Sequence, residues 1–226
     1  MISIEFPKDG KLRSRDVVSR SNSRSTGKYP SWKKTRMLEY ESQHELHAFL
    51  LLDACPAVLS FNEQPCVVHY EINGITHRHY PDILVETASG KELWEVKEES
   101  DARDPVVATR SEFLQKLLPS KGYTYRVILA EQLSLEPLLE NVRKLIRFGH
   151  NSVPLHIRER YRRKFQQQEL SYWGELVSGS QEERQYVSRL VLEGFLEIDM
   201  SILLSESSVV MMRQTKEQGI WPSLLT

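Results

Sequence analysis

The spacing of apolar residues is helical from Ser42 onward and changes to a strand-like pattern beyond residue 60. After Ser42, apolar residues such as Leu46 and Phe49 recur at three- and four-residue intervals, which predicts a helix with one apolar face. Ser42 followed three residues later by Glu45 is typical of a capping box at a helix start. Pro56 predicts the end of this helix.

Short apolar runs separated by turn residues follow the predicted helix. Asn73-Gly74 and Ser89-Gly90 are typical of hairpin turns, and Asp104-Pro105 is typical of a helix start. The predicted strands are Cys66–Ile72, Ile75–Thr87, Lys91–Glu98 and Tyr123–Ala130, and the predicted helices span about 105–118 and 135–148. Three successive strands and a fourth reached through a helix predict an α/β fold, a mixed sheet with flanking helices.

The pattern changes again at Gly149–Pro154. The expected elements there are helices at Leu155–Gln167, Leu170–Val177 and from Ser180 to Gly194, and strands at Phe195–Asp199 and Ser207–Met212. Three helices followed by a two-stranded ribbon predict a winged helix. We therefore expect three segments: an N-terminal arm at residues 1–34, an α/β domain at 35–150 and a winged-helix domain at 151–226.

Positive charge is concentrated at the start of the chain. Residues 1–37 hold ten Lys and Arg against three acids, a local charge of +7 in a chain whose net charge is −1. This asymmetry favours a basic arm that contacts a polyanion, although a merely solvating tail is the alternative. The candidate DNA-contacting residues are Arg20, Arg24, Lys28, Lys33 and Lys34.

The two cysteines, Cys55 and Cys66, do not indicate a disulfide framework or a zinc site, and they fit a reducing cytosol. No apolar run approaches the roughly 18–20 residues that a membrane span requires. The N-terminus lacks the apolar region of a secretion signal. We therefore expect a cytoplasmic protein.

Ionisable residues interrupt two apolar strands at Asp82 and at Glu95-Val96-Lys97. Alternate strand residues share a face, so Glu95 and Lys97 point together while Trp94 and Val96 point to the other side. The turn at Ser89-Gly90 can bring Asp82 beside them. Carboxylates without thiolate or imidazole partners suit a hard divalent ion, chiefly Mg²⁺. Glu45, on the preceding helix, can hold a second ion or its waters, and Lys97 can position a water or stabilise a phosphate in the transition state.

These residues resemble the TnsA family, the endonuclease subunit of heteromeric transposases. The resemblance rests on a basic leader, a helix with Ser42-x-x-Glu45 and three strings in the strand region. These strings are FNEQP at 61–65, YPDILV at 80–85 and WEVK at 94–97. It covers nearly the whole chain and implies a restriction-endonuclease-like nuclease domain followed by a winged helix.

The resemblance implies functional assignments for individual residues. Asp82 and Glu95 would bind Mg²⁺, which Mn²⁺ can replace, with the backbone carbonyl of Val96 as a further ligand. Lys97 would be the catalytic lysine and Glu45 the helix acid, with Glu41 as the alternative to Glu45. The implied activity is hydrolysis of the 5′ strands at double-stranded transposon ends in bacteria. The implied partners are a TnsB-type transposase and a TnsC-type AAA+ ATPase regulator.

Two other function classes stay open at this point. One is a stand-alone restriction or repair nuclease of the same fold, and the other is a catalytically silent DNA-binding or assembly module. His77 and His79 are two residues apart, but strand alternation predicts that they face away from Asp82, so we do not predict a histidine metal site. Glu63 and Gln64 either belong to the family motif or fix the turn into the first strand.

Overall fold

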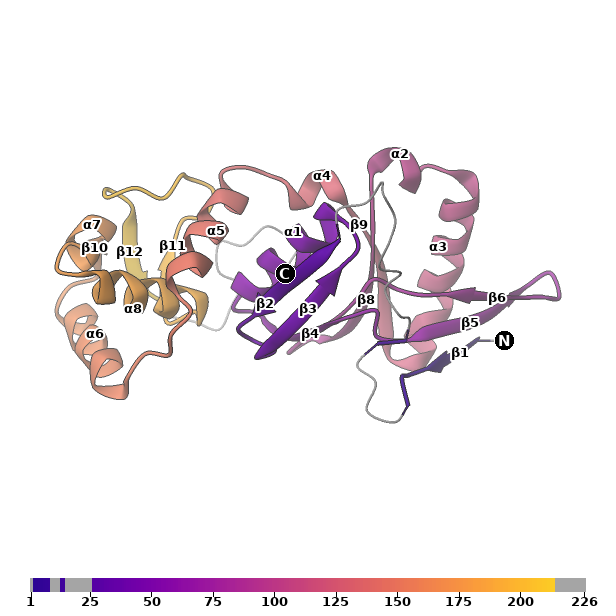
Figure 1. Cartoon of the computed structure of the whole chain (residues 1–226), viewed down its shortest axis with the longest axis horizontal. Helices are drawn as coiled ribbons and strands as arrows, with labels where there is room; N and C mark the ends of the chain where they lie inside the picture. The colour runs from indigo at the N-terminus through magenta and orange to yellow at the C-terminus, as the bar shows by residue number, and fades with distance from the viewer. Residues whose placement is uncertain (1, 9–12, 15–25, 214–226) are drawn as a thin grey trace. The chain divides into compact units, whose positions relative to one another are not determined.

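The structure is a computed structural model of the chain and describes residues 2–8, 13–14 and 26–213. The chain forms two compact units (Figure 1). The first contains residues 1–49 and 58–134, and the second contains residues 50–57 and 135–226. Within the described residues, no helix is long and apolar enough to cross a membrane.

A four-stranded mixed sheet is the centre of the first unit. Its strands are β4 (Val58–Glu63), β7 (Ile83–Thr87), β8 (Gly90–Lys97) and β9 (Tyr123–Leu129), in the order β4-β7-β8-β9. β7 is antiparallel to both β4 and β8, whereas β9 lies parallel to β8. The connection from β8 to β9 runs through helices, as the sequence predicted. The mixed α/β sheet with flanking helices is therefore confirmed.

Two smaller sheets accompany the main one. The first has the order β1-β5-β6, with antiparallel strands β1 (Ile2–Glu5), β5 (Val67–Ile72) and β6 (Ile75–His79). The second is the hairpin of β2 (Gly27–Ser31) and β3 (Arg36–Tyr40). Asn73 and Gly74 both have positive φ, 52° and 77°, as the predicted hairpin turn between β5 and β6 requires.

Helices cover the main sheet. They are α1 (Gln43–Ala54), whose end belongs to the second unit, α2 (Glu99–Ala102), α3 (Pro105–Leu117), the 3₁₀ helix η1 (Leu118–Lys121) and α4 (Ala130–Leu133). Phe49 on α1 packs against Phe61 on β4, with ring centroids 5.9 Å apart. The side chain of Asp104 caps α3 by accepting hydrogen bonds from the amides of Val106 and Val107.

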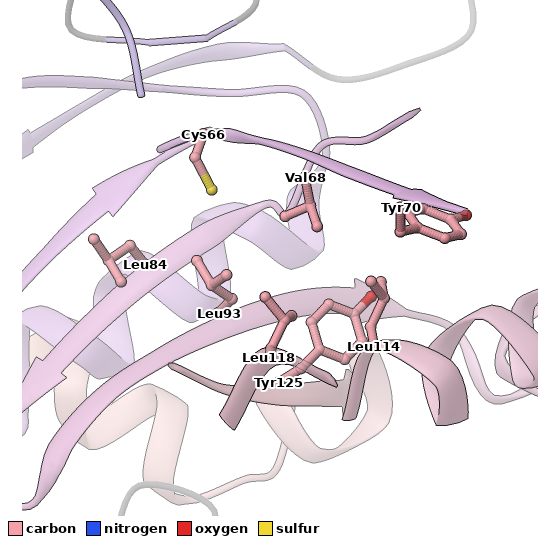
Figure 2. Packing of buried hydrophobic residues seen from close by; sticks show 8 residues of the cluster. All are labelled: Cys66, Val68, Tyr70, Leu84, Leu93, Leu114, Leu118 and Tyr125. Carbon is pink, nitrogen blue, oxygen red and sulfur yellow. The ribbon is translucent and has the colours of Figure 1, made fainter. Parts of the chain in front are cut away.

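A cluster of buried residues joins the β1-β5-β6 sheet, the main sheet and α3 (Figure 2). Val68 and Tyr70 of β5 lie on one side, and Leu114 of α3 packs against the same cluster. The other members are Cys66, Leu84, Leu93, Leu118 and Tyr125. Burial in this cluster raises the pKa of the Cys66 thiol to about 12, so the thiol stays protonated. Tyr125, the member of this cluster on β9, also contacts His79 at the end of β6.

Besides the end of α1, the second unit contains four helices and one sheet among its described residues. The helices are α5 (Leu138–Phe148), α6 (Leu155–Gln167), α7 (Trp173–Val177) and α8 (Gln181–Leu192), and the strands are β10 (Leu170–Tyr172), β11 (Leu196–Ile198) and β12 (Val209–Met212). The strand order is β10-β12-β11, and both pairs are antiparallel. The helix α8 begins where the sequence predicted, and the side chain of Ser180 caps it by accepting from the amide of Glu183. Classification of this unit as a winged helix stays a prediction.

Several elements differ from those that the sequence predicted. The strand β4 was missed, and the single strand predicted over Ile75–Thr87 is two strands that belong to different sheets. The arm predicted at 1–34 contributes β1 and β2 to paired strands, and Tyr29 is buried against Phe49. The predicted boundary at residue 150 places α5 in the α/β domain. In the structure α5 belongs to the second unit and packs on α8.

Candidate active site

Asp82 and Glu95 stand opposite each other where β7 begins. Ile83 pairs with Trp94 in the antiparallel register, so the preceding position places Asp82 opposite Glu95. The amide of Asp82 donates to the carbonyl of Trp94 at 2.9 Å, and the amide of Val96 donates to Oδ2 of Asp82 at 2.7 Å. The Asp82 carboxylate is therefore fixed by the backbone of β8.

Glu95 is a buried carboxylate whose two oxygens have different surroundings. Its Oε1 lies 2.9 Å from Nζ of Lys97 and 3.4 Å from a guanidinium nitrogen of Arg110. Its Oε2 lies 3.2 Å from Nε2 of His79. Burial raises the pKa of Glu95, but His79 and Lys97 outweigh it, so the pKa is lowered and the carboxylate is ionised at neutral pH.

Lys97 shares a face of β8 with Glu95, as strand alternation predicted. Its ammonium contacts Glu95 directly, whereas the Trp94 indole N–H on the other face donates to Glu92 at 2.7 Å. Burial alone lowers the pKa of Lys97, but the negative charges of Glu95 and Asp82 raise it above the ordinary lysine value. Lys97 is therefore a fixed positive charge at neutral pH.

Glu45 stands in the first turn of α1. Its amide donates to the hydroxyl of Ser42 at 3.1 Å, and its carboxylate accepts from that hydroxyl and from the amide of Glu41. The predicted capping box is thus present, except that the backbone amide that donates to the Glu45 carboxylate is that of Glu41 instead of Ser42. Burial raises the pKa of Glu45, and the ammonium of Lys97 acts against this increase.

Three carboxylates share this site and disfavour one another's charge. Burial raises the pKa of Asp82 well above its ordinary range, and the negative charges of Glu95 and Glu45 raise it further. The Val96 amide and Lys97 oppose this increase only in part. The structure therefore brings together all four predicted side chains, three carboxyl groups and one ammonium. Glu41, the alternative helix acid, instead accepts from the Gln64 side chain at 3.0 Å.

The donor set fits a hard divalent cation. Within the described part of the chain, Oε2 of Glu95 is buried and contacts Nε2 of His79 at 3.2 Å without a well-aligned hydrogen bond, so it keeps a lone pair for a cation. No group of three or more His, Cys, Asp or Glu side chains among those residues is arranged to hold a metal. Mg²⁺ is commonly held by one or two carboxylates with waters, and Asp82 and Glu95 supply such a pair. At Val96 it is the amide that contacts Asp82, and the carbonyl remains a predicted ligand.

Two residues of this cluster were missed by the sequence analysis. His79 was expected to face away from Asp82, yet its ring contacts Glu95, and this prediction was wrong because β6 and β7 belong to different sheets. The alternation argument needs one continuous strand, and Pro81 interrupts it. Arg110 comes from α3, a later element of the chain. No local sequence pattern indicates that its side chain contacts Glu95.

Glu63, the last residue of β4, and Gln64, the residue after it, support the site. Both oxygens of Glu63 accept from Arg36, at 2.8 and 2.7 Å, which joins β4 to β3. Gln64 has a positive φ of 42°, and its amide donates to the carbonyl of Asp82 at 2.7 Å. Of the two interpretations that the sequence left open, the geometry favours fixing of the turn.

The candidate DNA-contacting residues have different positions. Arg20 and Arg24 lie outside the described residues. Lys28 is exposed and lies 3.6 Å from Glu39. Lys33 donates to the carbonyl of Val58 at 2.9 Å, and Lys34 donates to Ser60 at 3.1 Å. The last two therefore also hold the β2–β3 hairpin against β4.

Comparison with known families gives one match. Residues 55–130 match the model of the TnsA-like endonuclease N-terminal domain. This segment contains Asp82, Glu95 and Lys97 and runs from just before β4 to the end of β9. A search of the curated proteins found no match to the chain.

Proposed function

We propose that this chain is a metal-dependent DNA endonuclease of a transposition system. The proposal rests on the match of residues 55–130 to the TnsA-like endonuclease domain and on the acidic site within that segment. The observation that carries the proposal is the arrangement around Glu95. A buried carboxylate stands opposite Asp82, with His79 beside one oxygen at 3.2 Å and a lysine 2.9 Å from the other.

The chemistry of the proposed reaction is hydrolysis of a phosphodiester bond. Asp82 and Glu95 would hold Mg²⁺, with the Val96 carbonyl and Glu45 as further ligands to the ion or its waters. Bound Mg²⁺ would neutralise charge on the phosphate and increase the acidity of a water. Mn²⁺, which also prefers oxygen ligands, would replace it.

Lys97 has a separate role in the proposed reaction. Its ammonium stays charged and is held on the site by Glu95, so it can donate hydrogen bonds to the scissile phosphate or to the attacking water. A charge fixed in advance stabilises the transition state without having to reorganise during the reaction. Glu95 therefore both shares in cation binding and orients Lys97.

The proposed substrate is double-stranded DNA at transposon ends, cut on the 5′ strands. In this scheme a TnsB-type transposase cuts the 3′ strands and a TnsC-type AAA+ ATPase regulates the complex, in the bacterial cytoplasm. We propose that residues 151–226 form a winged helix that mainly contacts these proteins. Its basic helix α6 supports this view, because Arg158 and Arg160 are paired with Glu193 and Glu183 instead of being free for phosphates.

A cleavage assay with a matched pair of variants tests the proposal. Asp82→Asn removes one ligand charge, whereas Glu86→Gln alters a carboxylate of the same strand that pairs with Lys91 away from the site. With transposon-end DNA, partner transposase and Mg²⁺, Asp82→Asn should abolish 5′ nicks and Glu86→Gln should retain them. Equal 5′ cleavage by the Asp82 variant and wild type would reject the site. Cleavage of any DNA without partners would favour a stand-alone nuclease, and binding without cleavage by wild type would favour an assembly module.

A further inference from the structure

A buried polar chain of three side chains lies behind the candidate active site. The hydroxyl of Tyr125, on β9, lies 3.0 Å from Nε2 of His79, at the end of β6. The same nitrogen lies 3.2 Å from Oε2 of Glu95, on β8. His79 is 6% exposed, Tyr125 2% and Glu95 3%, so water does not screen these contacts. Whether Nε2 carries a hydrogen or a lone pair therefore decides if its contacts with Tyr125 and Glu95 are attractive.

The contact between His79 and Glu95 indicates a hydrogen on Nε2. A bare Nε2 would point a lone pair at a carboxylate oxygen 3.2 Å away, which is repulsive and costly in a buried site. With a hydrogen on Nε2 the same contact is attractive, and the hydroxyl oxygen of Tyr125 then accepts from this N–H. Only the tyrosine contact has full hydrogen-bond geometry. Glu95 is thus held by His79 but keeps a lone pair of Oε2 unused.

The cluster is rigid because its members come from different elements. β6 belongs to the small sheet, β8 and β9 are parallel neighbours in the main sheet, and Tyr125 belongs to the buried cluster shown in Figure 2. The His79 and Tyr125 rings also pack edge to face, with centroids 5.7 Å apart. On the other side, Lys97 and Arg110 contact Oε1 of Glu95. Both oxygens of the carboxylate are therefore oriented, each by a different set of groups.

We propose that His79 is a positioning residue for the cation-binding carboxylate of Glu95, and that Tyr125 fixes the imidazole of His79. This inference rests on the proposed function, in which Asp82 and Glu95 bind the metal. His79 holds the Glu95 carboxylate at one rotation, so that its free lone pair faces the cation that Asp82 also binds. Partners of this kind change metal affinity or activity by roughly 10–100-fold when they are removed.

The test compares variants of the full chain that differ in one hydrogen-bond donor. His79→Leu removes the donor at similar volume, and His79→Gln keeps a side-chain N–H close to the position of Nε2. Tyr125→Phe removes the hydroxyl and leaves the ring. His77→Gln is the matched control, because His77 lies on the same strand but stacks on Tyr70. Mn²⁺ binding to each protein without DNA is measured by electron paramagnetic resonance, and thermal unfolding is measured in parallel.

His79→Leu should weaken Mn²⁺ binding by roughly 10–100-fold, Tyr125→Phe by less, and His79→Gln should bind almost like wild type. His77→Gln should bind like wild type. Two results would show that His79 has only a structural role and would overturn the inference. In the first, His79→Leu lowers the melting temperature but leaves the Mn²⁺ affinity unchanged. In the second, His79→Gln loses as much Mn²⁺ affinity as His79→Leu. If wild type itself does not bind Mn²⁺, the proposed function fails, and the inference fails with it.

Discussion

Replacement of Lys97 by alanine removes the one lysine that contacts the Glu95 carboxylate among the described residues. Its ammonium lies 2.9 Å from Oε1 of Glu95, and its side chain is 28% exposed. A hydrogen bond to a charged group contributes about 1.5–3 kcal/mol to the free energy of unfolding. Arg110 lies 3.4 Å from the same oxygen and can take over part of this contact. The stability loss should therefore lie at the lower end of that range, and the variant should fold.

The effect of Lys97→Ala on catalysis should be larger than its effect on stability. Loss of one pre-positioned electrostatic group costs roughly 10²–10³ in rate in other enzymes. Lys97 contributes most where negative charge develops on the phosphate, so the loss should appear in the cleavage rate more than in DNA or metal binding.

The assay measures 5′ and 3′ nicks at transposon ends in the presence of partner transposase and Mg²⁺. Lys97→Ala should lose 5′ nicks while the partner's 3′ nicks persist, which leaves the element attached to donor DNA and yields cointegrates. Lys91→Ala is the control, because Lys91 lies on the same strand and pairs with Glu86. Wild-type 5′ cleavage by Lys97→Ala would refute the catalytic role of the residue.

Three further predictions concern other parts of the chain. The Glu183 carboxylate is partly buried, which raises its pKa, but hydrogen bonds from Tyr161 and Arg160 outweigh this and lower it. The contribution of Glu183 to stability should therefore be present above about pH 4 and be lost as the pH falls through its folded pKa. Glu183→Gln should lower the melting temperature at pH 7 and lower it much less at pH 3. An equal decrease at both pH values would reject this prediction. Because the pKa of Cys66 is about 12, iodoacetamide should leave Cys66 unmodified in the folded protein at pH 8 and alkylate it in urea, as peptide mass spectrometry would show. Arg20→Ala with Arg24→Ala should reduce the salt slope of DNA binding by about 2 if both residues contact phosphates, and an unchanged slope would assign them elsewhere. Deletion of residues 1–30 is a poorer test, because it removes β1 and most of β2.

The sequence predicted those parts of the site that depend on local periodicity. Glu95 and Lys97 share a face because alternate residues of one strand must do so, and the turn at Ser89-Gly90 brings Asp82 into register with Glu95. The capping pattern at Ser42 placed Glu45 in the first turn of α1. Each of these conclusions needs only neighbouring residues or one tight turn.

The parts that failed depend on contacts between distant segments. The orientation of His79 depends on which sheet β6 joins, and β6 pairs with β5, whose other neighbour is the N-terminal strand β1. Arg110 reaches Glu95 only because α3 crosses back over the sheet. The strand β4 contains Ser60 between Leu59 and Phe61 and ends with two polar residues, and its short pattern was not recognised. Periodicity indicates which face is buried but does not identify the partner strand.

The most direct test of the account is the position of a bound cation. Crystals soaked in Mn²⁺ would show the ion by its anomalous scattering. The account predicts one peak with oxygen atoms of both Asp82 and Glu95 as ligands, at about 2.1–2.2 Å, slightly longer than Mg²⁺ distances. A peak bound elsewhere, or a saturating soak that leaves these two carboxylates without an ion, would contradict the central claim that they form a metal-dependent nuclease site.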